Sequence, residues 1–501
     1  MSTVVKQLIR NVFTSWAGMA VTLAITFLFT PYLIDQLGKS QYGIWSLVFS
    51  LIAYMKLADA GMNQAVAKYI PQYYATGDYD QLNQVVSSAA RIYTVISLLI
   101  VALSVGLAFG VLQFFQIEPR YLEVARITLI LIGTNQAVTY IFIPFASLLP
   151  FHRADIVNYF EIGGMLIQTL LIVVMLELGL GLTAMAGVVL VVNIISHCWR
   201  YQIRRKKFPM VKFSRAAITG EKTRALLTYG SYSLLIVAAW IVIFQTDNIV
   251  IGKFLSMEAV AVYAVPAAIV TQLRNTINAI AVPIVPTISH INAQQDDRQV
   301  MEIYLRSTRY LYYLSALICV GALIFGGPFI LLWVKDGFTE SITVLQILIV
   351  PAAIYLPQMI ANSVLFGVSR HKVLFYILTA EGVSNIALSL ILVGHYGIIG
   401  VALGTAIPQF LIYLFIYPKV FYRTMNSPVT PFYLTALKSV VISTVIALPV
   451  SLGMRALLRP EHWASLFADV GIVLLVAVIG FFGLILETED RDRILKKLRL
   501  R

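Results

Sequence analysis

Long apolar runs separated by short polar segments dominate the chain from end to end. Each run is about 20 residues or longer, the length that an α-helix needs to cross the hydrocarbon core of a bilayer. Such runs occur at 10–30, 42–66, 92–116, 125–148, 156–177, 181–202, 226–251, 259–287, 309–334, 342–367, 373–393, 397–417, 433–456 and 464–486. The pattern therefore predicts an all-α polytopic membrane protein with about fourteen transmembrane helices.

Composition supports this fold class. Hydrophobic residues make up 59% of the 501 residues and charged residues 12%, whereas soluble domains carry roughly 25% charged residues. This balance excludes a soluble enzyme, a secreted disulfide scaffold and a disordered chain. The first apolar run follows Lys6 and Arg10 without a clear small-residue cleavage site, so we interpret it as a span and not as a removable signal.

The net charge of +13 is explained by topology. With the N-terminus on the cytoplasmic side, the predicted inner loops hold 28 Lys and Arg residues, the outer loops 7 and the spans 2. This is the positive-inside bias of membrane proteins. It predicts that both termini are cytoplasmic, and it removes the need for a nucleic-acid partner.

The chain is expected to contain two similar halves, because matching residues recur about 220 positions apart. Asp78 precedes Asp296 by 218 residues, and Glu161 precedes Glu381 by 220. The predicted division is a six-helix bundle at 1–203, a basic cytoplasmic linker at 204–225, a second six-helix bundle at 226–417, two extra helices at 418–487 and a basic tail at 488–501. An even number of spans per half places the pseudo-two-fold axis along the membrane normal. We expect the basic linker to face lipid and to bind anionic headgroups.

Several short motifs lie in a characteristic order. They are FTPYLIDQLG at 29–38, YGIW at 42–45, DAG at 59–61, KYIPQYYATGD at 68–78, TDNIVIG at 246–252 and PTIS at 286–289. In sequence and spacing the chain resembles bacterial polysaccharide exporters of the multidrug/oligosaccharidyl-lipid/polysaccharide superfamily. The resemblance implies the fold of multidrug-and-toxin extruders with two further C-terminal helices. It also implies an inner-membrane flippase that moves an undecaprenyl-diphosphate-linked oligosaccharide to the outer leaflet by alternating access.

Three alternatives stay open at this point. A cation-coupled multidrug exporter and a flippase for the peptidoglycan-precursor lipid would share the same fold. An integral-membrane glycosyltransferase or polymerase would need a sizeable extramembrane loop, and every predicted outer loop is about ten residues or fewer. The chain has no P-loop, nucleophile elbow or metal-ligand spacing. We therefore expect neither enzymatic activity, nor a cofactor, nor a metal site. Polysaccharide polymerase or ligase machinery is a possible partner, which the sequence leaves open.

The candidate substrate-binding residues are polar positions within predicted spans. A charge at mid-bilayer costs roughly 2.5–3.5 kcal/mol on insertion scales, so a charge retained there suggests function. Arg274 lies deep in its span, with Gln272, Asn275 and Asn278 beside it. A guanidinium can hold a diphosphate through paired hydrogen bonds, and the amides can bind sugar hydroxyls. Lys56 is a second cation that could assist.

The candidate coupling residues are acids. Glu161 and Glu381 occupy matched positions in the two halves, and either could bind and release H⁺ or Na⁺ within the membrane or simply hold helices together. Asp59 lies three residues after Lys56 and could neutralise it. Asp247 lies near the outer end of its span, where it could pair with Lys253. The 26 tyrosines are expected mainly as interfacial anchors.

Overall fold

The computed structural model describes residues 3–59, 61–146, 154–335, 337–458 and 460–492. Within these ranges every regular element is helical, and twelve helical stretches are long and apolar enough to cross a membrane. The predicted all-α membrane fold is therefore confirmed. Arg153 of a predicted inner loop and residues 493–501 of the predicted basic tail lie outside the described residues.

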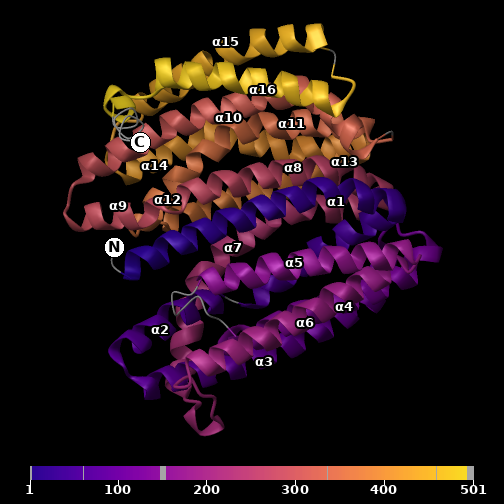
Figure 1. Cartoon of the computed structure of the whole chain (residues 1–501), viewed down its shortest axis with the longest axis vertical. Coiled ribbons are helices and arrows are strands. Elements are labelled where there is room, and N and C mark those ends of the chain that lie inside the picture. Colours follow the sequence, from indigo (N-terminus) through magenta and orange to yellow (C-terminus); the bar gives the residue numbers. More distant parts are fainter. Residues whose placement is uncertain (1–2, 60, 147–153, 336, 459, 493–501) are drawn as a thin grey trace. The chain divides into compact units, whose positions relative to one another are not determined.

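The chain divides into two compact units, Met1–Ala261 and Val262–Arg501. In the first unit, α3, α4 and α6 lie side by side, and α5 packs on α6 and α1 (Figure 1). Its helices are α1 (Thr3–Met55), α2 (Met62–Thr76), α3 (Tyr79–Gly110), α4 (Pro119–Ala146), α5 (Ala154–Glu177), α6 (Gly181–Lys207) and α7 (Gly220–Phe254), with 3₁₀ turns η1 (Lys56–Asp59), η2 (Leu112–Phe114) and η4 (Arg215–Ala217).

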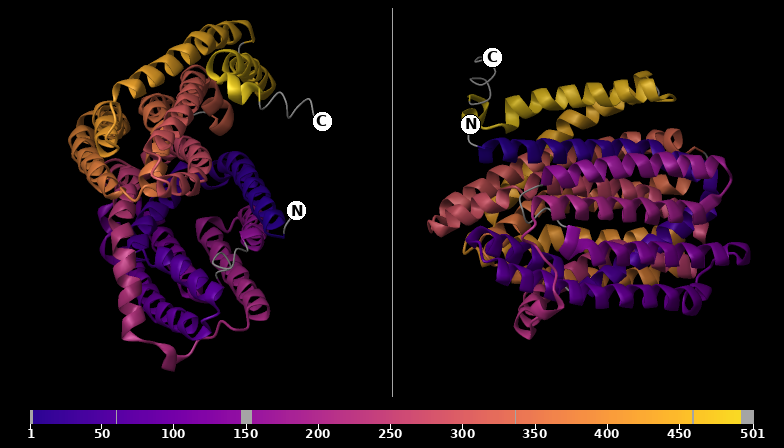
Figure 2. Two further views of the ribbon diagram at one scale, coloured as in Figure 1. Left: turned by 90° about the vertical axis from the view of Figure 1, so that its left-hand side faces the viewer. Right: turned by 60° about the horizontal axis from the view of Figure 1, so that its bottom comes forward.

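The second unit is built around α10 and α13. The division falls within α8, and α15 and α16 run side by side against α10 (Figure 2). Its helices are α8 (Met257–Ala281), α9 (Ile284–Ala293), α10 (Asp297–Val334), α11 (Thr339–Tyr355), α12 (Met359–Gly367), α13 (Lys372–Leu411), α14 (Tyr417–Thr424), α15 (Thr430–Leu458) and α16 (Trp463–Gly480), with a 3₁₀ turn η5 (Leu356–Gln358) and π-helical turns η6 (Ile412–Ile416) and η7 (Phe481–Ile485).

The number of spans depends on two glycines. The stretches Thr14–Asp59 and Lys372–Thr424 are 46 and 53 residues long, about twice what one crossing needs. Each contains a glycine with non-helical backbone angles: Gly38 has φ 73° and ψ 167°, and Gly397 has φ 56° and ψ −134°. Both conformations have positive φ, which a residue without Cβ adopts readily. Dividing the two stretches there separates the runs that the sequence pattern predicts, but the count of fourteen stays a prediction.

The second predicted span, 42–66, was wrong as one continuous helix. Helix α1 ends at Met55, η1 follows, and α2 begins after Gly61, whose φ is 71°. Gly61 is left-handed, a conformation that interrupts an α-helix and that glycine tolerates best. The break lies between Met55 and Met62, which are both buried, so hydropathy alone does not reveal it.

Matched positions in the two units share one local structure. Asp78 precedes α3 and accepts a hydrogen bond from the backbone N–H of Gln81 at 3.1 Å. Asp296 precedes α10 and accepts one from Gln299 at 2.9 Å. Both aspartates satisfy an N–H of the first helical turn that has no partner within the helix. This agreement supports the predicted repeat, which otherwise stays a prediction.

The predicted bundle boundary at the basic linker also stays a prediction. The first compact unit extends to Ala261 because α7 packs against α1, α2 and α3. The linker itself is not a lipid-facing segment along its whole length: Arg204 is buried, and its guanidinium donates to the backbone carbonyls of Phe145 and Val211. The expectation that the whole basic run faces lipid was therefore wrong for this residue.

Candidate functional site

A buried polar cluster lies inside the second unit, among helices that are otherwise apolar. Its side chains come from four segments, η5, α13, η6 and the start of α14. They are Gln358, Glu381, Asn385, Thr405, Gln409, Tyr413 and Tyr417, each 5% exposed or less. Polar groups cut off from water are costly unless they are hydrogen-bonded. The cluster therefore has to supply its own partners.

Glu381 is the acid of this cluster and is 1% exposed. The hydroxyl of Tyr413 donates to its Oε2 at 3.1 Å, and the side chain of Gln409 also donates to the carboxyl. Because Gln409 and Tyr413 lie four residues apart around the start of η6, both reach the same carboxyl. Helix α13 thus supplies the acid, and the chain just beyond it supplies the donors.

The π-helical turn η6 shapes the cluster. A π turn shifts the regular backbone hydrogen-bond ladder and frees carbonyl groups, and such turns often occur at functional sites. The freed carbonyl of Tyr413 accepts a hydrogen bond from Nε2 of Gln358 at 2.7 Å. The same nitrogen lies 3.1 Å from the hydroxyl of Tyr312, on α10. The amide therefore ties three helical segments together across the interior.

Arg274 lies within electrostatic range of Glu381. The guanidinium interacts with this carboxyl and with the phenol of Tyr355, and the ring of Tyr355 lies 5.6 Å from that of Tyr413. The structure thus brings together two residues that the sequence analysis assigned to different roles, the candidate diphosphate ligand and a candidate coupling acid. In this arrangement the positive charge of Arg274 can offset the negative charge of an ionised Glu381 within an apolar unit.

Arg274 is itself partly exposed, and its polar neighbours on α8 are partly or fully exposed as well. Gln272 is partly exposed, and Asn275 and Asn278 are exposed. Their side chains are available to a ligand or to a neighbouring surface. Nothing in the structure tests their predicted sugar-binding role, which stays a prediction.

Asp59, in the first unit, has a tyrosine partner. The hydroxyl of Tyr93 donates to its Oδ1 at 2.8 Å, and the backbone N–H of Asn63 donates to Oδ2 at 3.3 Å. Lys56 is exposed, and the ion pairs of the described residues do not include one between Lys56 and Asp59. The expectation that these two neutralise each other was therefore wrong, since the chain leaves the α-helix at η1 and turns the carboxyl toward α3.

Asp247 is buried on α7 beside α1. Its carboxyl interacts electrostatically with Tyr54, whose hydroxyl is hydrogen-bonded to Thr246. The amide of Asn248 donates to Ser50 at 2.9 Å. The TDNIVIG motif therefore joins two helices of the first unit. The expected place of Asp247 near the outer end of its span and its pairing with Lys253 stay predictions.

Glu161 and Glu381 have different environments despite their matched positions. Glu161 is exposed on α5 and interacts electrostatically with Arg200 of α6, whereas Glu381 is buried. An exposed acid in water or at an interface loses less hydration than a buried one. The two matched acids therefore differ in burial, and the coupling role expected of either stays a prediction.

Sequence reasoning missed the tyrosines. Tyr93, Tyr304, Tyr413 and Tyr417 are buried in the interiors of their units, where the sequence predicted interfacial anchors. Tyr417 donates to Oδ1 of Asn362 at 2.5 Å. A tyrosine within an apolar run gives no sign of which acid or amide its hydroxyl will meet, because that partner lies on another helix.

Within the described ranges, no group of three or more His, Cys, Asp or Glu side chains could hold a metal ion.

Comparison with known proteins gives one family and several relatives. A family described as "Polysaccharide biosynthesis protein" matches residues 8–292. A membrane protein of Bacillus subtilis, "Uncharacterized membrane protein EpsK", is 21% identical over 94% of both chains. A protein of Shigella flexneri named "Putative O-antigen transporter" is 21% identical over 81% of this chain and 94% of its own.

Solved structures share the fold. "Lipid II flippase MurJ, inward closed conformation" covers 98% of this chain and 100% of its own at 14% identity, with a TM-score of 0.70. The inward-facing conformation of a multidrug resistance MATE family transporter of the MOP superfamily covers 81% and 99% at 15% identity, with a TM-score of 0.67. At this identity the likeness concerns the fold, which agrees with the multidrug-extruder fold expected from the sequence.

Proposed function

The chain belongs to the polysaccharide biosynthesis protein family, and from this premise we propose that it flips an undecaprenyl-diphosphate-linked oligosaccharide from the inner to the outer leaflet for surface polysaccharide synthesis. The observation that carries the proposal is the buried carboxyl of Glu381 in electrostatic interaction with the partly exposed Arg274, within an otherwise apolar helical unit. Such charges are expensive in a membrane and mark substrate or ion pathways. The name of a relative, a putative O-antigen transporter, supports this cargo.

In the proposed mechanism, Arg274 binds the diphosphate, and the carboxylate of Glu381 competes with the diphosphate for Arg274. The carboxylate of Glu381 offsets the charge of Arg274 when no substrate is bound. Protonation of Glu381 would remove that competing anion, leaving the guanidinium to the diphosphate, whose oxygens it can bind in pairs. The bound diphosphate would in turn favour a protonated Glu381, since two anions near one cation repel each other. This exchange links proton binding to substrate binding.

The other candidate residues receive supporting roles. Gln272, Asn275 and Asn278 would bind sugar hydroxyls beside Arg274, and exposed Lys56 would attract the anionic headgroup. We assign Asp59 to positioning Tyr93, because its carboxyl is already held by two donors. The proposal places the protein in the inner membrane, and the excess of Lys and Arg in the predicted inner loops supports cytoplasmic termini.

Deletion of the gene tests the cargo directly. In the deletion strain, an undecaprenyl-linked oligosaccharide should accumulate on the cytoplasmic leaflet while peptidoglycan synthesis continues. Accumulation of the peptidoglycan precursor would assign the chain to that lipid instead. Increased drug sensitivity with unchanged surface polymer would favour a multidrug exporter.

Point variants test the mechanism. Arg274→Ala should abolish surface polysaccharide without lowering the amount of protein in the membrane. Glu381→Gln should retain part of the transport but flatten its response to a pH gradient, because a neutral amide copies only the protonated acid. Glu161→Gln is the matched control, since that acid is exposed. Normal polymer in the Arg274→Ala strain would remove this residue from the mechanism.

A further inference from the structure

The chain after α6 forms an ordered strap over the first unit. Residues 208–219 follow the helix, and three of their backbone N–H groups donate to α3. Lys212 donates to Oδ1 of Asn83 at 2.7 Å, and Ser214 donates to Oγ of Ser87 at 3.1 Å. The N–H of Thr219 donates to the neighbouring Ser88 at 3.4 Å. The strap is therefore held in one place by hydrogen bonds of its own backbone.

Arg204 fastens the start of the strap. Its Nε donates to the carbonyl of Phe145 at 2.7 Å, and its Nη1 donates to the carbonyl of Val211 at 2.6 Å. Phe145 lies in the last turn of α4, where carbonyl groups lack a partner within the helix and favour a cation. Arg204 is 5% exposed, so its guanidinium contacts backbone carbonyls inside the protein and is not presented at the surface.

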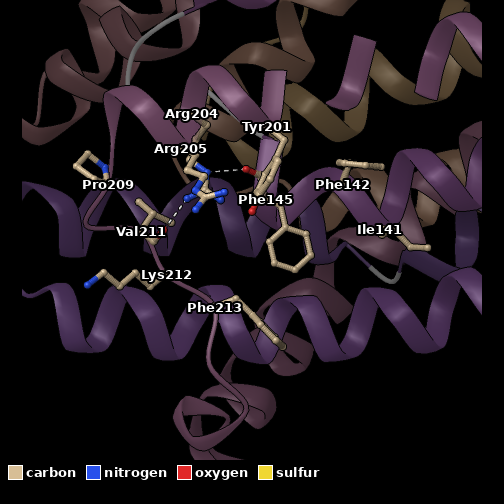
Figure 3. Close-up of a pocket in the computed structure, with 10 residues that line it drawn as sticks. All are labelled: Ile141, Phe142, Phe145, Tyr201, Arg204, Arg205, Pro209, Val211, Lys212 and Phe213. Carbon is tan, nitrogen blue, oxygen red and sulfur yellow. Dashed lines mark hydrogen bonds between the residues drawn. The ribbon is translucent and has the colours of Figure 1, made fainter. Parts of the chain in front are cut away.

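A pocket of about 810 Å³ lies beside Arg204, between the strap and the ends of α4 and α6 (Figure 3). One part of its wall is aromatic, with Phe142, Phe145 and Phe213, and the rings of Phe145 and Phe213 meet edge to face at 5.7 Å. Another part carries two exposed cations, Arg205 and Lys212. Among the residues of the described part of the chain that line this pocket, none is an acid.

The helical register explains why only part of the basic run reaches the pocket. Tyr201, Arg204 and Arg205 line it, and positions three and four apart share one face of a helix. Lys206 and Lys207 belong to the same run and are equally exposed, but they do not line the pocket. The run therefore contains two kinds of cation, which differ in position and not in charge.

We propose that this pocket is a binding site for one anionic phospholipid of the surrounding leaflet. Arg205 and Lys212 would hold the headgroup phosphate, and Phe142 and Phe145 would contact the first part of an acyl chain. The combination of cations and aromatic rings at the end of two membrane helices fits this ligand, since basic pockets between such helices bind anionic headgroups. A soluble phosphate would leave the aromatic wall exposed to water, so it matches only half of the site. The proposal does not depend on the transported cargo.

Bound lipid would stabilise the strap. The ligand would contact α4 and α6 and also Lys212 and Phe213 of the strap. It would therefore link α4 to the strap, as the hydrogen bonds of Arg204 also do. The strap leads into α7, which packs against α1, α2 and α3. Anionic lipid should therefore raise the thermal stability of the first unit and protect residues 208–219 from proteolysis.

The test uses the full-length protein, stripped of lipid in a neutral detergent. Phosphatidylglycerol or phosphatidylcholine is added back, and retained lipid is measured by native mass spectrometry together with the thermal unfolding midpoint. The pocket variant is the double substitution Arg205→Ala, Lys212→Ala. The matched control is Lys206→Ala, Lys207→Ala, which removes two equally exposed charges from the same run. Inorganic phosphate is a separate arm.

We expect the wild type and the control to retain one phosphatidylglycerol and to gain stability from it. The pocket variant should bind roughly thirty-fold more weakly, which corresponds to about 2 kcal/mol for two headgroup contacts. Equal losses in both double variants would show general electrostatic attraction and overturn the proposal, as would equal binding of phosphatidylcholine. Stabilisation by inorganic phosphate alone would also overturn it. If the pocket variant unfolds without lipid, Lys212→Ala alone should still lose affinity relative to Lys206→Ala alone, and equal affinities would refute the site.

Discussion

The hydrogen bond between Tyr413 and Glu381 gives a quantitative test of the buried cluster. Tyr413→Phe removes the hydroxyl that donates to Oε2 at 3.1 Å. It keeps the ring, which lies 5.6 Å from the ring of Tyr355 and 5.4 Å from that of Tyr417. The substitution therefore isolates one hydrogen bond while packing is retained.

The expected loss depends on the charge of the carboxyl. A hydrogen bond to an ionised group contributes about 1.5–3 kcal/mol, and one between neutral groups about 0.5–1.5 kcal/mol. Gln409 still donates to Glu381 in the variant, so the acid is not left without a partner. We expect Tyr413→Phe to destabilise the protein by about 2 kcal/mol if Glu381 is ionised and by about 1 kcal/mol if it is protonated.

Denaturant unfolding in detergent, followed by tryptophan fluorescence, measures this difference. The same substitution is made in the Glu381→Gln background, where the acceptor is neutral and the smaller loss is expected. The two losses separate the contribution of the charge from that of the hydroxyl. A loss below about 0.3 kcal/mol in both backgrounds, smaller than even a weak neutral hydrogen bond, would refute the hydrogen bond and the cluster built on it.

Three further substitutions test other parts of the fold. Gly43→Ala would place a Cβ 1.8 Å from the backbone carbonyl oxygen of Met257, so we expect greatly reduced folded protein by size-exclusion chromatography, and wild-type yield would disprove this close approach. Arg204→Ala removes two charge-assisted hydrogen bonds and should lower the free energy of unfolding by roughly 3 kcal/mol. It should also make residues 208–219 accessible to limited proteolysis, and equal cleavage in Lys206→Ala would argue against the role of Arg204 in holding this segment. Glu487→Gln weakens contacts of 2.5 and 2.7 Å to two arginines of α10 and should lower the thermal midpoint at low salt more than at high salt, whereas a salt-independent effect would contradict an electrostatic contact.

The fold class was predictable because it depends on local pattern. Runs of apolar residues long enough to span a bilayer must become helices there, since each backbone polar group needs a partner within the segment. The positions of Asp78 and Asp296 before α3 and α10 were also readable, because an N-cap is an interaction within one turn. Hydropathy did not reveal the break at η1, where apolar residues continue through a change of backbone conformation.

The site was only partly predictable. The sequence identified Arg274 and Glu381 as unusual charges in apolar runs, but it placed them in separate roles. Their electrostatic interaction depends on the tertiary structure, as do the hydrogen bond of Tyr93 to Asp59 and the burial of Glu381 where Glu161 is exposed. Matched positions such as Glu161 and Glu381 keep their spacing along the chain but have different surroundings in the fold.

The amino-acid pattern by itself determined that this chain is a bundle of membrane helices with retained charges, because the bilayer imposes that answer on each segment separately. The tertiary structure alone decided which tyrosine meets which acid and which arginine of the basic run is buried. Those outcomes depend on side chains from distant helices meeting at the same place, and spacing along one helix carries no information about its neighbours.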